Sequence, residues 1–195
     1  MQEVCMSYSQ ITKNALARSL KKLMLTQPLH KITIQQLTAD CGVTRHTFYN
    51  HFQDIYELLG WVYQTEIIEG LEEYRNCASW KQGFLSVLYY TQSNKTICLN
   101  TFHSLGREHL EDFLYGVIYD VIIKIVDELD EERKEQVTQQ AKQEIADFYT
   151  LAILEQVIHW LKTGANTDPT QIVDKVGRIM DGSITRGLEN YQNSK

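Results

Sequence analysis

Proline is scarce in this chain of 195 residues, which has only Pro28 and Pro169, and glycine is limited to ten positions. Apolar residues recur mostly at spacings of three and four, and no run has the alternating pattern of a β-strand. The sequence therefore predicts an all-α protein of about nine helices. Their expected ranges are 9–26, 34–40, 45–50, 55–74, 80–91, 95–102, 107–128, 133–163 and 169–191.

Cysteine is also sparse, and the four residues Cys5, Cys41, Cys77 and Cys98 form no CxxC pair and no zinc-finger spacing with histidine. We expect reduced thiols, most of them buried. His103 and His109, with Glu108 and Cys98 close in sequence, match no standard set of metal ligands. No metal site is predicted.

Long apolar runs and leader signals are missing as well. The most apolar stretch, residues 117–126, contains Asp120 and Lys124 and is far shorter than the roughly 20 residues of a membrane span. The amino terminus lacks the basic and apolar regions of a signal peptide. We therefore expect a cytoplasmic protein that does not bind membranes.

Common catalytic motifs are missing too, since the chain contains no GxSxG, P-loop, GxGxxG or HExxH pattern. The sequence therefore does not favour an enzyme, and no cofactor is predicted.

Charge is unevenly distributed along the chain. The net charge of −6 argues against binding nucleic acid through bulk charge. Residues 1–60, however, hold six Lys and Arg against four Asp and Glu, a net +2, which leaves 13 against 21, a net −8, for the remainder. The amino-terminal part alone suits a polyanion. The acidic run at residues 127–132 is interpreted as a solvated connection.

Two short helices follow the first long one. Thr33 and Thr44 are good N-caps, Gly42 suits the turn between the two helices, and Asp54 caps the next long helix. This pattern is typical of a helix-turn-helix.

The second short helix has two faces. Phe48 and Phe52, with Val43, are expected to pack onto the first helix. The other face is rich in hydrogen-bond donors near a helix amino terminus, which suits phosphate, and comprises Arg45, His46, Thr47, Tyr49 and Asn50. Arg45 is the best candidate for a bidentate contact with guanine. The alternative is a helical hairpin with an ordinary polar surface.

Residues 33–52 resemble the DNA-binding domain of the TetR family of bacterial transcriptional regulators. The family pattern T-[IV]-x-x-[IL]-[AT]-x-x-x-G-V-[ST]-x-x-[TA]-[FL]-Y-x-[HY]-F fits here with few departures. The resemblance implies a helix-turn-helix DNA-binding domain at residues 1–54 and a helical domain for effector binding and dimerisation at residues 55–195. It also implies a homodimer, most often a repressor released by a small-molecule effector, on a palindromic double-stranded DNA operator.

The resemblance also assigns contacts to DNA. It implies phosphate contacts from Thr33, Thr44, Thr47, Tyr49 and His51, and base contacts from Arg45, His46 and Asn50. One departure is Ile55, which follows Asp54 where the family usually has Lys, so one phosphate contact is missing. With only +2 on this domain, we expect weak, salt-sensitive nonspecific binding.

Beyond residue 60, 15 aromatic residues are enough to line an effector pocket or simply to fill a helical core. The candidate ligand-binding residues are Trp61, Phe84, Leu88, Phe102, Tyr119 and Tyr149.

Residues 151–161 are apolar on nearly all sides, which indicates a face against a second subunit. Small residues in the last helix permit close helix approach, so these two helices would form a four-helix dimer interface. The expected interface residues are Leu154, Ile158, Leu161, Val176, Met180 and Ile184.

The ending Trp160-Leu161-Lys162-Thr163-Gly164, followed by Pro169, resembles a TetR subgroup that contains regulators of dihydroxyacetone kinase operons. The subgroup includes activators that work with a protein coactivator, so activation is an alternative to repression. A further alternative is a protein-interaction module with a vestigial helix-turn-helix, which Ile55 favours.

Overall fold

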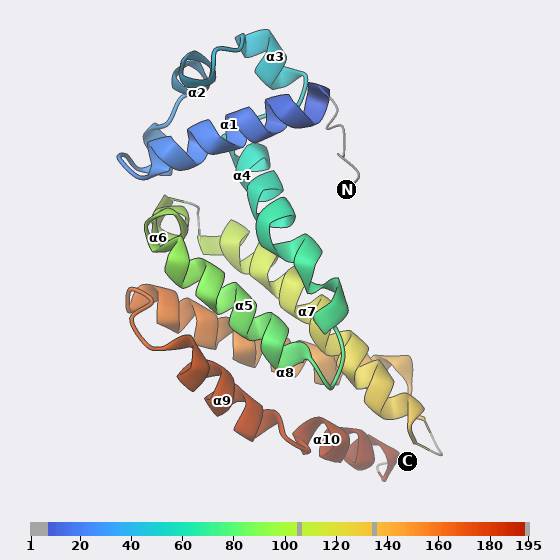
Figure 1. The fold of residues 1–195 in the computed structure, drawn as a ribbon. Helices are drawn as coiled ribbons and strands as arrows, with labels where there is room; N and C mark the ends of the chain where they lie inside the picture. The colour runs from blue at the N-terminus through green and yellow to red at the C-terminus, as the bar shows by residue number, and fades with distance from the viewer. Residues whose placement is uncertain (1–7, 105–106, 134–135, 194–195) are drawn as a thin grey trace, which may run out of the picture. The chain divides into compact units, whose positions relative to one another are not determined.

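The computed structural model describes residues 8–104, 107–133 and 136–193, without the side chains of residues 107–109. Every regular element in these ranges is helical, as predicted, and ten of them are α-helices (Figure 1). None of the helices in the described ranges is long and apolar enough to cross a membrane.

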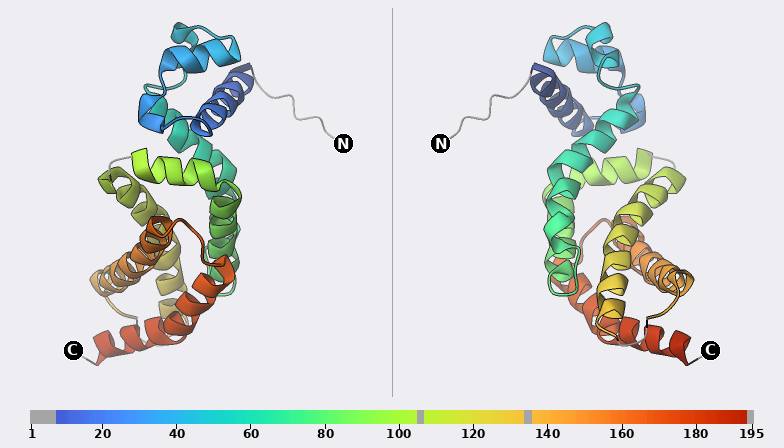
Figure 2. Two further views of the ribbon diagram at one scale, coloured as in Figure 1. Left: turned by 90° about the vertical axis from the view of Figure 1, so that its left-hand side faces the viewer. Right: turned by 90° about the vertical axis from the view of Figure 1, so that its right-hand side faces the viewer.

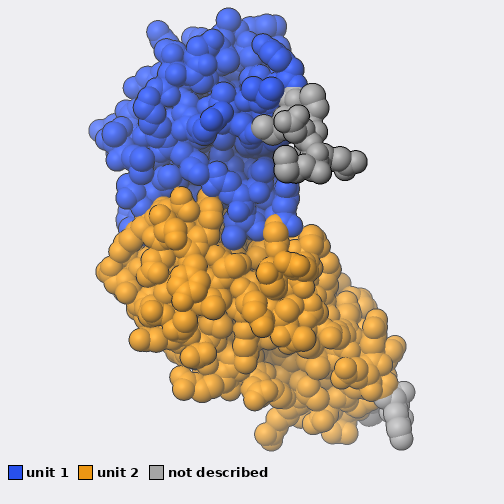
Figure 3. Space-filling view, viewed as in Figure 1, with its two compact units in different colours: residues 1–69, 96–104 blue, residues 70–95, 105–195 orange. Residues whose placement is uncertain are grey.

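The chain forms two compact units. Unit 1 comprises residues 1–69 and 96–104, and unit 2 comprises residues 70–95 and 105–195 (Figure 3). These units group residues that pack together. The predicted boundary after residue 54 instead separates the DNA-binding domain from the domain for effector binding and dimerisation. That boundary stays a prediction.

Unit 1 is built on α1 (Tyr8–Met24), which packs against α2 (Ile34–Cys41) and α4 (Ile55–Tyr63). It also holds the short α3 (Arg45–Tyr49) and most of α6 (Lys95–Ser104). Helices as short as α2 and α3 are not stable alone. Their buried residues, Leu37 and Phe48, are both fully inaccessible to solvent, and such burial contributes about 1.5–3 kcal/mol per side chain.

The predicted caps of unit 1 are confirmed. The Thr33 side chain accepts a hydrogen bond from the Gln36 N–H, Thr44 from that of Thr47, and Asp54 from that of Glu57. Gly42 ends α2 at φ 70°, a left-handed conformation that glycine adopts without strain.

The helix expected at residues 55–74 is not continuous. After α4 ends at Tyr63, the chain forms a π-helical turn at Gln64–Ile68 and a 3₁₀ helix at Glu69–Tyr74. A continued α-helix would turn Thr65 and Glu66 towards the side that Val62 buries. The wider π turn leaves both exposed and buries Ile68.

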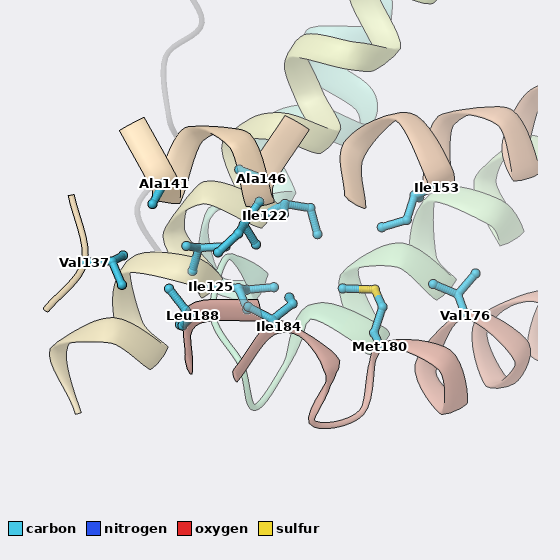
Figure 4. Packing of buried hydrophobic residues seen from close by; sticks show 12 residues of the cluster. Ile122, Ile125, Val137, Ala141, Ala146, Ile153, Val176, Met180, Ile184 and Leu188 are labelled. Atoms are coloured by element: carbon cyan, nitrogen blue, oxygen red, sulfur yellow. The ribbon is translucent and has the colours of Figure 1, made fainter. Parts of the chain in front are cut away.

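Unit 2 contains the remaining helices. They are α5 (Trp80–Ser93), α7 (Arg107–Glu131), α8 (Gln139–Lys162), α9 (Pro169–Met180) and α10 (Ser183–Gln192). Helices α7 and α8 pack side by side (Figures 1 and 2). The main core cluster draws Ile122 and Ile125 from α7, Ile153 from α8 and Ile184 from α10 (Figure 4).

The last predicted helix is divided in two. Gly182, at φ 68°, separates α9 from α10, so the expectation of one helix at residues 169–191 is wrong. Both parts run antiparallel to α8. Lys175 of α9 donates to Gln156 at 2.8 Å, and the hydroxyls of Tyr149 and Ser183 are 2.8 Å apart at the start of α10. After the break, α10 packs against α7 and α8, whereas α9 packs against α5.

The acidic run is not the solvated connection that its composition indicates. Residues 127–131 belong to α7, and the Asp130 side chain is fully buried. Lys142 of α8 lies 3.0 Å from both Asp127 and Asp130, and Asp130 also accepts the Val137 N–H at 3.2 Å. A cation 12 positions along the chain therefore allows this carboxylate to be buried. The connection lies after it, and α8 begins at Gln139 rather than near residue 133.

Candidate nucleic-acid interface

Three residues, Gly42, Val43 and Thr44, separate α2 from α3. The turn is closed by hydrogen bonds from the N–H groups of Gly42 and Val43 to the Thr38 carbonyl. Thr44 then caps α3. This is the helix-turn-helix that the sequence predicts.

The two predicted faces of α3 are present. Phe48 and the following Phe52 are 0% and 3% exposed, whereas Tyr49 is 51% exposed. Six of the eight residues proposed to contact DNA are exposed and two, Thr47 and His51, are partly buried; the exposed ones are Thr33, Thr44, Arg45, His46, Tyr49 and Asn50. The apolar side thus anchors the helix and leaves the polar side accessible.

Thr44 and Thr47 form a local pair at the start of α3. Their hydroxyl oxygens are 2.8 Å apart, and Thr44 also accepts the Thr47 N–H at 3.0 Å. Each hydroxyl has one proton, and only one of the two protons can lie between the oxygens. The pair therefore has a second proton to donate to an outside acceptor such as a phosphate oxygen.

Gln36, to which the sequence pattern gave no role, orients Thr33. The Gln36 side-chain oxygen accepts the Thr33 N–H at 2.8 Å, while the Thr33 oxygen accepts the Gln36 N–H at 3.2 Å. This capping box satisfies two backbone donors at once. Its signal, Thr followed three positions later by Gln, is present in the sequence.

A charged contact joins α1 to the other end of α2. Lys22 of α1 forms an ion pair with Asp40, and Ser19 donates to the Leu37 carbonyl at 3.2 Å. The hydrogen bond from Lys22 is the largest of the effects that hold the pKa of Asp40 below its ordinary value. Residues outside the polar face therefore also position the helix-turn-helix.

The proposed ligand-binding residues are divided between the two units. Trp61 lies against Phe52 in unit 1, where Phe102 also belongs. In unit 2, Leu88 belongs to one core cluster with Trp160, while Tyr119 and Tyr149 pack against the other and Phe84 against both. A ligand role for these side chains stays a prediction.

The proposed dimer residues are placed differently from expectation. All six are at most 8% exposed within a single chain: Leu154, Ile158, Leu161, Val176, Met180 and Ile184. Within one chain they are core residues, and their part in an interface with a second subunit stays a prediction. The apolar character of residues 151–161 serves packing inside the chain on one side. On the other side, Phe148 and Leu151 of α8 and Ile179 of α9 are 68%, 50% and 66% exposed.

No group of three or more potential metal ligands occurs among the residues that the structure describes. The suggested His109 and Glu108 side chains lie outside them, as does Cys5. Cys41, Cys77 and Cys98 are thiols without disulfides, but they are partly buried rather than buried. Burial and the nearby Glu128 raise the pKa of Cys77 to about 12, which makes it unreactive near neutral pH.

Comparison with known families identifies the larger part of the chain. A TetR family model described as "Transcriptional regulator C-terminal region" matches residues 78–182, more than half of the sequence. The chain belongs to the TetR family. Members of this family are transcriptional regulators, which bind DNA operators and typically form dimers. The matched residues 78–182 do not overlap the motif at residues 33–52, so the two observations are independent.

A curated TetR-family relative is the HTH-type dhaKLM operon transcriptional activator DhaS of Lactococcus lactis subsp. lactis strain IL1403. It is 30% identical over 90 residues, which are 46% of this chain and 48% of the relative. The chain thus matches about half of the length of that relative.

Two solved structures share the TetR fold over 93% of this chain and 98% of theirs. The dihydroxyacetone kinase operon activator DhaS has a TM-score of 0.69 at 19% identity. NalD, the secondary repressor of the MexAB-OprM multidrug efflux pump in Pseudomonas aeruginosa, has a TM-score of 0.63 at 18% identity.

Proposed function

We propose that this TetR-family chain is a homodimeric, sequence-specific DNA-binding regulator whose two α3 helices, one from each subunit, enter successive major grooves of a palindromic operator. The observation that carries this proposal is the two-sided α3, anchored by buried Phe48 and Phe52 with its polar residues exposed. Arg45 and His46 would read bases, with Asn50 beside them. The expected phosphate contacts come from Thr33, Thr44, Thr47, Tyr49 and His51. Binding to DNA in this way needs no catalytic group. We place the protein in the cytoplasm, where the DNA is.

Dimerisation is assigned to a revised surface. Phe148, Leu151 and Ala152 lie on the exposed side of α8, at spacings of three and four. Because α8 and α9 run antiparallel, with Gln156 bound to Lys175, exposed Ile179 comes opposite residue 152. These four residues supply an apolar surface shared by two helices. A second copy related by twofold symmetry would cover it.

Two directions of regulation are candidates. Repression relieved by a small-molecule effector agrees with the common behaviour of the family and with the similarity to NalD. Activation with a protein coactivator is favoured by the similarity to DhaS, which is named an activator in both comparisons. Deleting the gene in its host distinguishes them, because transcription from the operator rises if the protein represses and falls if it activates.

Selection from a random library of double-stranded DNA by the purified protein tests DNA binding. An enriched palindrome, with half-sites about one or two helical turns apart, supports the dimeric regulator. If a folded, dimeric protein enriches no sequence, the proposed DNA-binding function fails. The interaction module with a vestigial helix-turn-helix, which Ile55 favours, then takes its place.

A further inference from the structure

The side chain of Asn100 on α6 makes four hydrogen bonds within unit 1. Its Nδ2 donates to the carbonyl oxygens of Met24 and Gln27, both at 2.8 Å. Its Oδ1 accepts the Leu29 N–H at 2.8 Å and the Ser104 hydroxyl at 3.0 Å. Three of these partners are more than 70 positions away in the sequence, at the end of α1 and the start of the next helical turn.

The backbone and hydroxyl groups around Asn100 need two donors and an acceptor, which a primary amide supplies. The last turn of a helix leaves carbonyl groups without partners in the helix, and the segment after α1 offers an unpaired N–H. Asn supplies two N–H donors and an oxygen that accepts twice, so one orientation of the amide satisfies all four groups. Met24 and Leu29 are 1% and 2% exposed, so solvent has little access to replace these bonds.

The segment that Asn100 holds leads directly to the helix-turn-helix. Only four positions separate Leu29 from Thr33, the N-cap of α2. In between, Ile32 is buried and its N–H donates to the Leu29 carbonyl at 3.0 Å. Because this connection is short and held by a backbone hydrogen bond, the position of Leu29 determines where α2 starts.

We propose that Asn100 is a positioning residue for DNA binding. It fixes the α1–α2 connection and thereby places Thr33 and the helices that follow for contact with the duplex. This inference rests on the proposed function, because it assigns a role within the same DNA-binding site. Asn100 itself does not touch DNA in this scheme, and it acts through the backbone of residues 24–29.

A second bond of α6 is separable from the first. Thr101 donates to the Ile97 carbonyl at 3.0 Å, so the hydroxyl of Tyr63, 2.8 Å away, donates to Thr101. Tyr63 is the last residue of α4 and not part of the α1–α2 connection. Tyr63→Phe removes this bond while leaving the four bonds of Asn100 in place.

Asn100→Asp tests the role of the amide. The substitution keeps the shape of the side chain but places acceptor oxygens opposite the Met24 and Gln27 carbonyls. Asn94→Asp is the matched control, because the Asn94 side chain donates to the Tyr90 carbonyl within its own helix segment, at 3.0 Å. The measurements are affinity for the selected operator, hydrogen exchange of the Leu29 and Ile32 amides, and unfolding by urea.

For Asn100→Asp we expect faster exchange at Leu29 and Ile32 and about tenfold weaker operator binding under conditions in which the protein is fully folded. The Asn94→Asp variant should retain both properties, and so should Tyr63→Phe. Ser104→Ala, which removes only the hydroxyl that orients the amide, should weaken operator binding by about twofold to threefold. It serves as the test if Asn100→Asp does not fold.

The outcomes separate this inference from the proposed function. If the wild-type protein binds its operator and Asn100→Asp binds it equally, the positioning role is wrong and the proposed function stands. Equal losses of affinity in Asn100→Asp and Asn94→Asp would likewise reduce the effect to general destabilisation and overturn the inference. If the wild-type protein binds no DNA, the proposed function fails and the positioning role fails with it.

Discussion

Lys142 at the start of α8 lies 3.0 Å from the carboxylate of Asp130, which is fully buried at the end of α7. The same ammonium group contacts Asp127 at 3.0 Å. One cation therefore joins the ends of two helices, and it offsets the cost of removing the Asp130 charge from water.

Lys142→Met leaves Asp130 buried without its cation. We expect a loss of about 3–5 kcal/mol in the free energy of unfolding, measured by urea titration. Lys124→Met is the control, because the contact of Lys124 with Glu72, at 3.6 Å, is exposed and contributes below about 1 kcal/mol. Similar losses in the two variants would contradict the expectation that the buried pair with Asp130 contributes more to the free energy of unfolding than an exposed pair.

The same pair predicts a dependence of stability on pH. Burial lowers the pKa of Lys142, but the hydrogen bonds to Asp130 and Asp127 outweigh burial and raise the pKa above its ordinary 10.5. The folded state thus holds this proton more tightly than the unfolded state. The resulting stabilisation is complete below about pH 10.5 and is lost as the pH rises through the folded pKa. The wild-type protein should therefore lose more stability than Lys142→Met over that alkaline range, which urea titrations at several pH values measure.

Arg45→Lys keeps the charge of Arg45 but removes its planar fork. If Arg45 contacts guanine with two hydrogen bonds, the variant should lose roughly 1–3 kcal/mol of discrimination at one base pair in each half-site. Its affinity for unrelated DNA should stay close to that of the wild type, since the charge is retained. Repeating the binding-site selection with the variant measures both effects, and an unchanged motif would exclude Arg45 from base recognition.

Gly42→Ala places a Cβ at φ 70°, where an L-residue is strained. We expect a cost of about 1–2 kcal/mol and weaker operator binding, because the strain falls on the turn between α2 and α3. Gly116→Ala is the opposite case, since Gly116 lies within α7 with open space around it and should gain up to about 1 kcal/mol. Thermal unfolding of the two variants compares these signs.

Leu151→Glu places a charge on the exposed apolar side of α8. We expect a folded protein whose dimer is weakened by roughly thirtyfold or more, because charging a central interface residue costs about 2 kcal/mol. Sedimentation velocity over a range of concentrations measures this change. Tyr89→Glu, on α5 and 43% exposed, should remain dimeric. Ile158→Glu should instead unfold the chain, since Ile158 is fully buried.

Local signals predicted the start of the site well. Caps at Thr33, Thr44 and Asp54 and the turn at Gly42 depend on residues within three or four positions, and all four occur as expected. The amphipathic pattern of α3 likewise identified Phe48 as its anchor.

Distant contacts explain most of what the sequence did not reveal. The burial of Asp130 requires Lys142, and the anchoring of Leu29 requires Asn100, 71 positions away. Neither has a short-range pattern. The same holds for the predicted dimer surface, since an apolar run shows that residues are buried without showing whether the same chain or another covers them.

The cations of the amino-terminal region have a bearing on how such a regulator would search a chromosome. Of the six Lys and Arg in residues 1–60, Lys21 and Lys22 form ion pairs with Glu66 and Asp40, and Lys13 lies over the rings of Phe52 and Trp61. Few of these positive charges are therefore available to bind the phosphates of unrelated DNA, and sliding along the duplex depends on such nonspecific binding. We expect short sliding distances and frequent dissociation, so that the protein reaches its operator mainly by three-dimensional diffusion.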